Sequence, residues 1–296
     1  MKNIIGHKVR IAPSPTGRLH IGTIRCAYHN WLIAQQRPNS TFLVRIDDTD
    51  LERSQPELIQ PIFDTLTKLG LNWDDTFQQS DRFDLYLSYA KRLIERGYAY
   101  RDDGCIRLKA ESLSDFSCDW VDTLSGDKPS NEQIDEYSKS QVIIKSDGSP
   151  AYNFASTVDD YCERVTWIVR GVDHISNTYK QALIFRILFD LDDYGDCMPM
   201  FSHVGLVCHK TGKKLSKRDS DEMNLEGINT DALLNYVLRL GWSPTEDTKA
   251  NNIIDKDKAI TLFLEGGKMK SNNAKIDLAK LEWYDKKYNS RQKKVG

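Results

Sequence analysis

The sequence predicts an α/β protein built on a doubly wound parallel sheet of the Rossmann type. Short apolar strands alternate with longer helical patterns along most of the chain, which is typical of βαβ units. Two of the predicted strands end at residues suited to a ligand, namely a Pro/Gly turn at 13–17 and the acidic pair Asp47 and Asp48. Ligands of such sheets bind at the carboxyl ends of the strands, so we expect the functional site there.

The first half of the chain predicts two buried strands and three helices. The strands are short apolar runs at 9–12 and 42–46. The helices have apolar side chains at a spacing of three and four residues and cover 23–35, 55–69 and 81–96. A glycine follows each of the last two helices, in the position that favours a left-handed C-terminal cap.

Residues 101–140 differ in composition from the rest of the chain. Serine, glycine and proline make them polar and rich in loops, which predicts an insertion between two halves of the sheet. The second half is expected to resume with a strand at 141–144 and to continue with a buried strand at 166–170. Further helices are expected at 178–191, 230–240 and 255–264. The basic segment 286–294 is expected to be a solvated terminus.

The composition is that of a soluble globular protein of 296 residues, with 40% hydrophobic and 28% charged residues. A net charge of −2 gives no global field for nucleic acid, so such contacts would need local basic patches. No apolar run is long enough to span a bilayer, and the N-terminus lacks the apolar core of a signal peptide. We therefore expect a cytoplasmic protein with no membrane contact, and a monomer.

Two motifs far apart in the chain contain groups that bind ATP. Residues 10–23 join a strand, a Pro/Gly turn and a helix start, and residues 213–218 read Lys-Lys-Leu-Ser-Lys-Arg. A helix N-terminus offers free backbone N–H groups and a positive dipole to phosphates. Gly17 and Gly22 let the backbone approach a nucleotide closely. His20 is suited to donate a hydrogen bond to a phosphoryl oxygen.

These motifs resemble those of the class I glutamyl-tRNA synthetases. His20-Ile21-Gly22-Thr23 is similar to the HIGH signature of that family, and Lys214-Leu215-Ser216-Lys217-Arg218 is similar to its KMSKS loop. Further blocks that resemble the family follow in the same order, at 45–54, 147–154, 170–174, 232–236 and 240–244. The resemblance covers nearly the whole chain but includes no anticodon-binding domain.

The resemblance implies a class I synthetase fold in four parts. They are the first half of the nucleotide-binding sheet at 1–100, a shortened connecting and acceptor-binding insertion at 101–140, the second half of the sheet with the KMSKS-like loop at 141–222, and a helical stem-contact-like region at 223–296. The implied reaction is attack of a glutamate carboxylate on the α-phosphorus of ATP, followed by transfer to tRNA. Such chemistry needs positioning and charge stabilisation rather than a general base, and Mg²⁺ would accompany the ATP.

The resemblance also implies a role for each site residue. Catalysis would fall to His20, Lys214 and Lys217. The remaining ATP-binding residues would be Thr16, Gly17, Gly22, Thr23, His174 and Ser216. The glutamate pocket would consist of Arg10, Ser14, Asp47, Tyr152, Ser156 and Arg170. The acceptor arm of the tRNA would contact Glu52, Arg53 and Ser54.

Arg10 and Arg170 lie in buried strands, where an arginine makes little sense as a core residue. A guanidinium donates two parallel hydrogen bonds to a carboxylate, so two arginines suggest a dicarboxylic substrate, or a carboxylate together with a phosphate. The alternative for Arg170 is a structural ion pair with one of the acidic residues Asp159, Asp160 and Asp173.

Asp47 departs from the family pattern, which usually has glutamate there to bind the α-amino group of the substrate. Aspartate is one methylene shorter, so its carboxylate would sit back by roughly 1 Å or more. This puts the identity of the amino acid in question. For Glu52, Arg53 and Ser54 the alternative is a helix start, with Ser54 as the N-cap and Glu57 at the third helical position.

We expect no zinc and no metal held by protein side chains alone. Some members of the family carry zinc in the insertion, but here that region offers only Cys105 and Cys118, which are too few ligands for a structural site. None of the six cysteines has CxxC spacing, and a disulfide framework is not expected in a chain of this kind.

Several other functions remain open at this point. The chain also resembles glutamyl-Q tRNA(Asp) synthetases in size, and these attach glutamate to a modified nucleoside. Activated glutamate could instead go to an acceptor other than tRNA, or the protein could be a non-catalytic tRNA-binding relative. Intact motifs at His20, Lys214 and Lys217 argue against the last of these. A simple adenylyltransferase would leave the arginines of the pocket unexplained.

Overall fold

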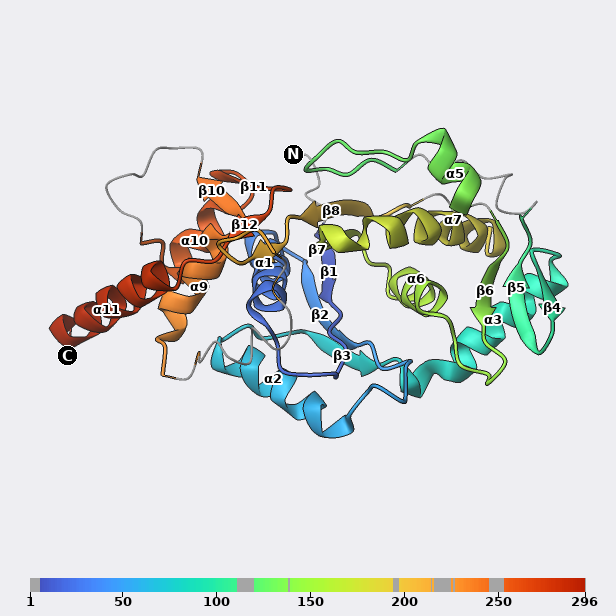
Figure 1. Ribbon diagram of the computed structural model, residues 1–296, viewed down its shortest axis with the longest axis horizontal. Helices are drawn as coiled ribbons and strands as arrows, with labels where there is room; N and C mark the ends of the chain where they lie inside the picture. Colours follow the sequence, from blue (N-terminus) through green and yellow to red (C-terminus); the bar gives the residue numbers. More distant parts are fainter. Residues whose placement is uncertain are drawn as a thin grey trace.

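The computed structural model describes residues 6–110, 120–137, 139–193, 197–213, 215, 225, 227–244 and 253–295. Its centre is a parallel sheet (Figure 1). Strands β1 (Lys8–Ile11), β2 (Thr41–Ile46) and β3 (Asp75–Gln78) pair in that order, with β2 in the middle. The predicted strands at 9–12 and 42–46 are thus confirmed, whereas β3 was not expected, because its first residues are exposed and its sequence is polar.

The second block of the sheet consists of β7 (Trp167–Gly171) and β8 (Met200–Val204), which also pair in parallel. The backbone N–H of Thr166 donates to the carbonyl of Lys8 at 2.9 Å and joins this block to β1. Across the molecule the strands therefore run in the order β3-β2-β1-β7-β8. This arrangement agrees with the doubly wound sheet that the sequence predicts.

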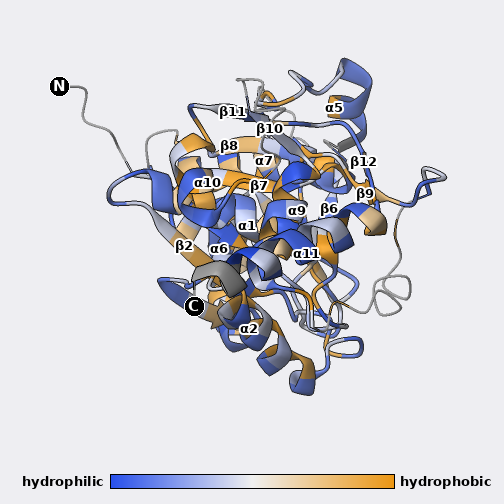
Figure 2. Ribbon diagram, turned by 90° about the vertical axis from the view of Figure 1, so that its left-hand side faces the viewer, coloured by the Kyte–Doolittle hydropathy of each residue, from blue (hydrophilic) through white to orange (hydrophobic). Residues whose placement is uncertain are grey.

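Helices cover both faces of the sheet. Helix α1 (Ile21–Gln36) shares one apolar cluster with β1 and β2, and α6 (Tyr152–Cys162) and α7 (Ile175–Leu191) share a second with β7 and β8. Figure 1 shows α1 on one side of the strands and α6 on the other. Figure 2 shows apolar strands, among them β2, β7 and β8, enclosed by helices of mixed polarity, as a sheet buried on both faces requires.

Two of the predicted helices begin with a short 3₁₀ turn. The turns Pro56–Leu58 and Ser80–Arg82 lead into α2 (Ile59–Lys68) and α3 (Phe83–Glu95). Gly70 and Gly97 have φ of 62° and 82°, as expected of glycines that end helices. The interpretation of Ser54 as an N-cap is wrong, because Gln55 holds that position and makes no capping hydrogen bond with its side chain.

The insertion contains an antiparallel sheet rather than loops alone. Strand β5 (Cys105–Leu108) pairs with β4 (Ala99–Asp102) on one side and β6 (Gln141–Ile144) on the other. Residues 141–144 were expected to resume the parallel sheet, but they complete this antiparallel one. The short helix α5 (Asn131–Tyr137) packs against α7.

The C-terminal region is a layer of helices that packs on α1 at one end of the molecule (Figure 1). It contains α9 (Thr230–Arg239), α10 (Lys256–Leu262) and α11 (Leu278–Val295). The prediction of a solvated terminus holds only in part, because Lys286 and Lys287 of α11 are exposed, whereas Tyr288 is buried and its hydroxyl donates to the carbonyl of Ile254 at 3.2 Å. The lysines of the segment gave no sign of this helix.

Two strand pairs connect this layer to the rest. Strand β10 (Trp242–Pro244) pairs with β11 (Gly267–Met269), and β12 (Ala274–Lys275) pairs with β9 (Val207–Cys208), which follows β8. Arg25 of α1 is buried and donates Nη1 to the carbonyl of Leu240 at 2.8 Å and Nη2 to that of Gly205. None of the helices within the described ranges is long and apolar enough to cross a membrane.

Candidate active site

Three buried arginines project from the same face of the parallel sheet. They are Arg10 on β1, Arg45 on β2 and Arg170 on β7. Side chains of a strand alternate between its two faces. The immediate neighbours of the arginines belong to the apolar cluster around α1, which are Val9, Ile11, Val44, Ile46 and Val169. The arginines therefore face away from α1 and toward α6.

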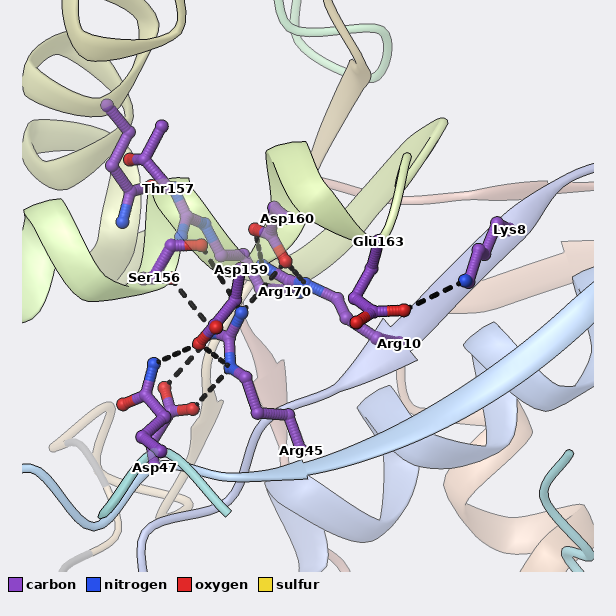
Figure 3. A network of polar contacts seen from close by, with 12 residues as sticks. Lys8, Arg10, Arg45, Asp47, Ser156, Thr157, Asp159, Asp160, Glu163 and Arg170 are labelled. Carbon is purple, nitrogen blue, oxygen red and sulfur yellow. Dashed lines mark hydrogen bonds and ion pairs between the residues drawn. The ribbon is translucent and has the colours of Figure 1, made fainter. Parts of the chain in front are cut away.

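Helix α6 supplies a carboxylate that holds two of these arginines. Asp160 accepts two hydrogen bonds from Arg10, from Nε and Nη2, each at 3.0 Å. Its Oδ1 also accepts from Nη1 of Arg45 at 2.9 Å. The three side chains are almost fully buried and lie together in Figure 3. Burial raises the pKa of Asp160, but the two guanidinium groups outweigh it and hold the pKa below its ordinary value.

Arg45 also binds two of the residues that we expected to contact glutamate. Its Nε and Nη2 donate to the two carboxylate oxygens of Asp47 at 2.6 and 3.3 Å. Its Nη2 donates to the hydroxyl of Ser156 at 2.9 Å. Burial raises the pKa of Asp47, and the ion pair with Arg45 opposes this shift. In this structure Asp47 is therefore the partner of Arg45, and Ser156, which is not among the residues lining the cavity described below, supports that arginine.

Asp159 is a second buried carboxylate of α6, next to this network. It accepts hydrogen bonds from the amide of Gln79 at 2.7 Å and from the hydroxyl of Tyr86 at 2.9 and 3.0 Å. Arg82 reaches its Oδ1 at 3.3 Å. Burial nevertheless raises the pKa of Asp159 to about 6, while Arg45 lies 3.8 Å away and opposes the shift. The pKa of Asp159 thus lies above the ordinary value of 3.8.

The hydrogen-bond partners of Arg170 are all neutral. Its Nη2 donates to Thr178 Oγ1 at 2.5 Å and to Gln181 Oε1 at 2.6 Å, and its Nε faces His203 Nε2 at 3.5 Å. Its Nη1 makes no hydrogen bond within the described part of the chain. Burial lowers the pKa of Arg170 to about 10, so the group stays charged at neutral pH. Arg170 is therefore a buried cation with a donor available for an anion.

His20 forms the N-cap of α1 instead of leaving the first N–H groups of that helix free. Its Nδ1 accepts from the backbone N–H of Gly22 at 3.1 Å and of Thr23 at 3.3 Å. A neutral imidazole has one donor and one acceptor, so this cap places the proton of the ring on Nε2. Nε2 lies 3.1 Å from the hydroxyl of Thr23. A Cβ atom at Gly22 would lie only 3.1 Å from the ring, so a larger residue would crowd the cap.

A single cavity of about 370 Å³ contains most of the predicted site. It lies at the carboxyl ends of β1 and β7, where the doubly wound fold predicts a ligand. Predicted residues that line it are Arg10, Ser14, Thr16, Gly17, His20, Gly22, Thr23, Asp47, Tyr152, Arg170 and His174. Leu215 also lines it and belongs to the lysine-rich loop. Lys214, Ser216 and Lys217 lie outside the described residues, so their positions remain predictions.

His174 closes the short 3₁₀ turn Val172–His174 that follows β7. Its Nδ1 lies 3.3 Å from the hydroxyl of Tyr152 and 3.3 Å from the amide of Asn177. Burial, reinforced by the charge of Arg170, lowers the pKa of His174 to about 4. The ring is therefore neutral at physiological pH and lies beside Tyr152 without adding charge.

The three residues expected to contact tRNA lie apart from the cavity. The side chain of Arg53 is 80% exposed and pairs with Asp50 at 2.5 Å. Glu52 is exposed, whereas the hydroxyl of Ser54 is buried and has no hydrogen-bond partner among the residues that the structure describes. Within this short segment, only Glu52 and Arg53 have exposed charges with which to meet a macromolecule.

Sequence reasoning missed several residues of the site. Arg45 carries a signal that could have been used, since it is a charged residue inside an otherwise apolar strand, as Arg10 is. Asp160 was considered only as a partner of Arg170, yet its ion pairs go to Arg10 and Arg45. Nδ1 of His203 lies 2.7 Å from a carboxylate oxygen of Asp122, a residue of the insertion. Neither residue gave a local signal, because this contact depends on the path of the insertion.

A metal site is not formed by protein groups in the ranges that the structure describes. No set of three or more His, Cys, Asp or Glu side chains there lies close enough together to hold an ion. Cys118, one of the two cysteines of the insertion, lies outside those ranges.

Known proteins share both the sequence and the fold. A family model described as tRNA synthetases class I (E and Q), catalytic domain, matches residues 7–105 and 102–283. A glutamate–tRNA ligase of Nostoc sp. is 34% identical over 331 residues, which cover 95% of this chain and 66% of that protein. A second glutamate–tRNA ligase, from Neorickettsia sennetsu, is 39% identical over 260 residues, or 86% of this chain and 59% of the relative.

Solved structures support the same fold. The glutamate tRNA ligase of Elizabethkingia meningosepticum, whose structure was determined in complex with its amino acid, superimposes with a TM-score of 0.78 at 24% identity. The match covers 96% of this chain and 70% of that one. The chain spans just under two thirds of the length of several curated relatives, 66% in the case of the Nostoc protein. Sequence and fold together assign this chain to the family of class I tRNA synthetase (E and Q) catalytic domains.

Proposed function

We propose that this protein activates glutamate with ATP and transfers it to a tRNA. The observation that carries this proposal is the state of Arg170, a buried guanidinium at the cavity whose hydrogen-bond partners are neutral. Such a group binds an anionic ligand strongly, because the ligand supplies the charge that its hydrogen-bond partners among the described residues do not. The relatives named above as glutamate–tRNA ligases make glutamate the natural candidate.

Different groups of the cavity would bind the two substrates, glutamate and ATP. Arg170 would hold the side-chain carboxylate of glutamate and leave its α-carboxylate free to react. Arg10 lines the same cavity, but the carboxylate of Asp160 already neutralises its charge. Arg10 would therefore position the substrate more than balance its charge. His20 at the start of α1 would share its Nε2–H between the hydroxyl of Thr23 and a phosphate oxygen of ATP.

In the proposed reaction an oxygen of the α-carboxylate forms a bond to the α-phosphorus of ATP. The bond from that phosphorus to the bridging oxygen breaks, and pyrophosphate leaves. A ribose hydroxyl of the tRNA then replaces AMP on the carbonyl carbon. Lys214 and Lys217 would neutralise the charge on the phosphates. Mg²⁺ would accompany the ATP.

Exchange of labelled pyrophosphate into ATP tests this proposal. We expect exchange that depends on L-glutamate, with aspartate and glutamine as matched controls, and we expect total tRNA to be required. Exchange with glutamate alone would favour transfer to a modified nucleoside or another acceptor. No exchange with any amino acid, with or without tRNA, would contradict the proposal. Lys217→Ala should abolish the exchange while the protein stays folded.

A further inference from the structure

Asp122 is a buried carboxylate that reaches strand β8 from the insertion. Its Oδ1 accepts hydrogen bonds from the backbone N–H groups of Leu124 and Ser125, each at 2.9 Å. Its Oδ2 accepts from the backbone N–H of His203 at 2.8 Å and lies 2.7 Å from Nδ1 of the same residue. Both oxygens therefore face donors, which is the environment that keeps a buried carboxylate ionised.

His203 connects Asp122 to the cavity. It is the register partner of Arg170 across β7 and β8, and it lies on the same face of the sheet. Its Nε2 is 2.8 Å from Thr178 Oγ1 and 3.5 Å from Nε of Arg170. Burial lowers the pKa of His203, although Asp122 opposes the shift, so the ring is neutral at physiological pH.

The proton of this neutral ring has only one favourable position. A carboxylate accepts hydrogen bonds and does not donate them, so Nδ1 next to Asp122 must carry the proton. Nε2 then has a lone pair. That lone pair faces the Nε–H of Arg170, which donates to it, and the hydroxyl of Thr178, whose single proton is shared with the carbonyl of His174 at 3.1 Å. With the proton on Nε2, the ring would instead direct an N–H donor at the Nε–H donor of Arg170.

We propose that Asp122 is a positioning residue of the candidate active site. By fixing the proton of His203 on Nδ1, it keeps Nε2 an acceptor and so orients the guanidinium of Arg170 for a carboxylate of the substrate. The identity of that substrate rests on the proposed function. The tautomer of His203 and the orientation of Arg170 do not, since both are properties of the protein alone. The insertion and the amino-acid pocket then form one unit.

The turn that holds Asp122 is also attached to β8 by other contacts. The backbone N–H of Thr123 donates to the carbonyl of Phe201 at 2.9 Å, and the hydroxyls of Thr123 and Ser202 lie 2.5 Å apart. The indole N–H of Trp167 donates to Ser202 at 2.8 Å. These contacts do not use the side chain of Asp122, so a change of that side chain leaves the contacts between this turn and β8 in place.

The test is the variant Asp122→Asn. Its amide has one acceptor, so its NH₂ group must face either two backbone N–H groups or His203. Facing His203 places the NH₂ group opposite one backbone N–H rather than two, and it is favourable at the ring only if the ring moves its proton to Nε2, which then meets Arg170 as a donor. We expect ¹⁵N NMR to show His203 as the Nδ1–H tautomer in the original protein and as the Nε2–H tautomer in the variant.

Binding supplies the functional readout. We expect the Kd for L-glutamate to rise at least tenfold in Asp122→Asn, while the Kd for ATP changes less than twofold. Asp127→Asn, an exposed carboxylate on the same turn, is the matched control and should change neither constant. A merely structural role would weaken both ligands together and lower the melting temperature.

Three results would overturn the inference. One is an Nε2–H or doubly protonated His203 in the original protein, which is decided without any variant. Another is an altered tautomer with an unchanged Kd for glutamate, and the third is an equal loss of both ligands. If the original protein binds no glutamate, the proposed function fails. The role of Asp122 is then decided by solvent exchange of the Arg170 Nε–H, which must be faster in Asp122→Asn.

Discussion

Replacing Asp160 with asparagine tests whether the arginine network stabilises the fold. Asp160 accepts three charge-assisted hydrogen bonds, two from Arg10 at 3.0 Å and one from Arg45 at 2.9 Å. Asparagine has one acceptor oxygen and no charge, so Arg10 loses its carboxylate inside the protein. Removing one partner of a buried ion pair costs about 3–5 kcal/mol. We expect the free energy of unfolding at pH 7 to fall by that amount.

Urea unfolding followed by circular dichroism measures this loss, with Asp127→Asn as an exposed control expected to change stability by less than about 0.5 kcal/mol. The effect depends on pH. The pKa of Asp160 in the folded protein lies below its ordinary value of 3.8, so its stabilisation is present above that pH and is lost as the pH falls through the folded pKa. A loss at pH 7 below about 1 kcal/mol, or one that persists unchanged at pH 2, would refute the reasoning.

Three further predictions follow from single contacts. Asp159 has a folded pKa of about 6 against an ordinary 3.8, so its contribution to the free energy of unfolding should fall as the pH rises from about 4 to 6. A ¹³C titration of its carboxyl carbon should have its midpoint near pH 6, and a midpoint below 4 would contradict this. His174 should titrate near pH 4 by NMR, and a midpoint near 6.5 would exclude the buried environment assigned to it. Gly267→Ala should lower the free energy of unfolding by roughly 1–3 kcal/mol or more, because its Cβ would lie 1.9 Å from the indole of Trp242. An unchanged urea midpoint would contradict this and would mean that β10 and β11 can separate with little loss of free energy.

The alternation of side chains explains why much of the fold could be read from the sequence. Val9, Arg10 and Ile11 already indicate a strand with one charged position facing away from the core. Arg170 shows the same pattern in β7. The motifs of the family then placed His20 and the turn before it at the same end of the sheet, and the cavity contains these predicted residues.

The parts that could not be read depend on contacts between distant segments. The sequence did not indicate that Asp47 and Ser156 bind Arg45, which they do because both side chains lie within reach of its guanidinium; Asp47 also lines the cavity, whereas Ser156 is not among its lining residues. Asp122 lies in a loop-rich stretch whose composition says nothing about β8. Helix α11 was hidden because its lysines resemble a solvated tail, whereas Tyr284 and Tyr288 bury its other face.

Helix α1 has a mechanical consequence for the site. It is a continuous helix of 16 residues, about 24 Å long, and it begins directly after its N-cap, His20, at the cavity. One turn further along, Arg25 donates hydrogen bonds to the carbonyl of Leu240, which ends α9, and to that of Gly205, which follows β8. A macromolecule that displaces α9 must therefore either break the contact with Leu240 or tilt α1 and shift His20 with it. A displacement of α9 is thus transmitted to the cavity through about one turn of α1.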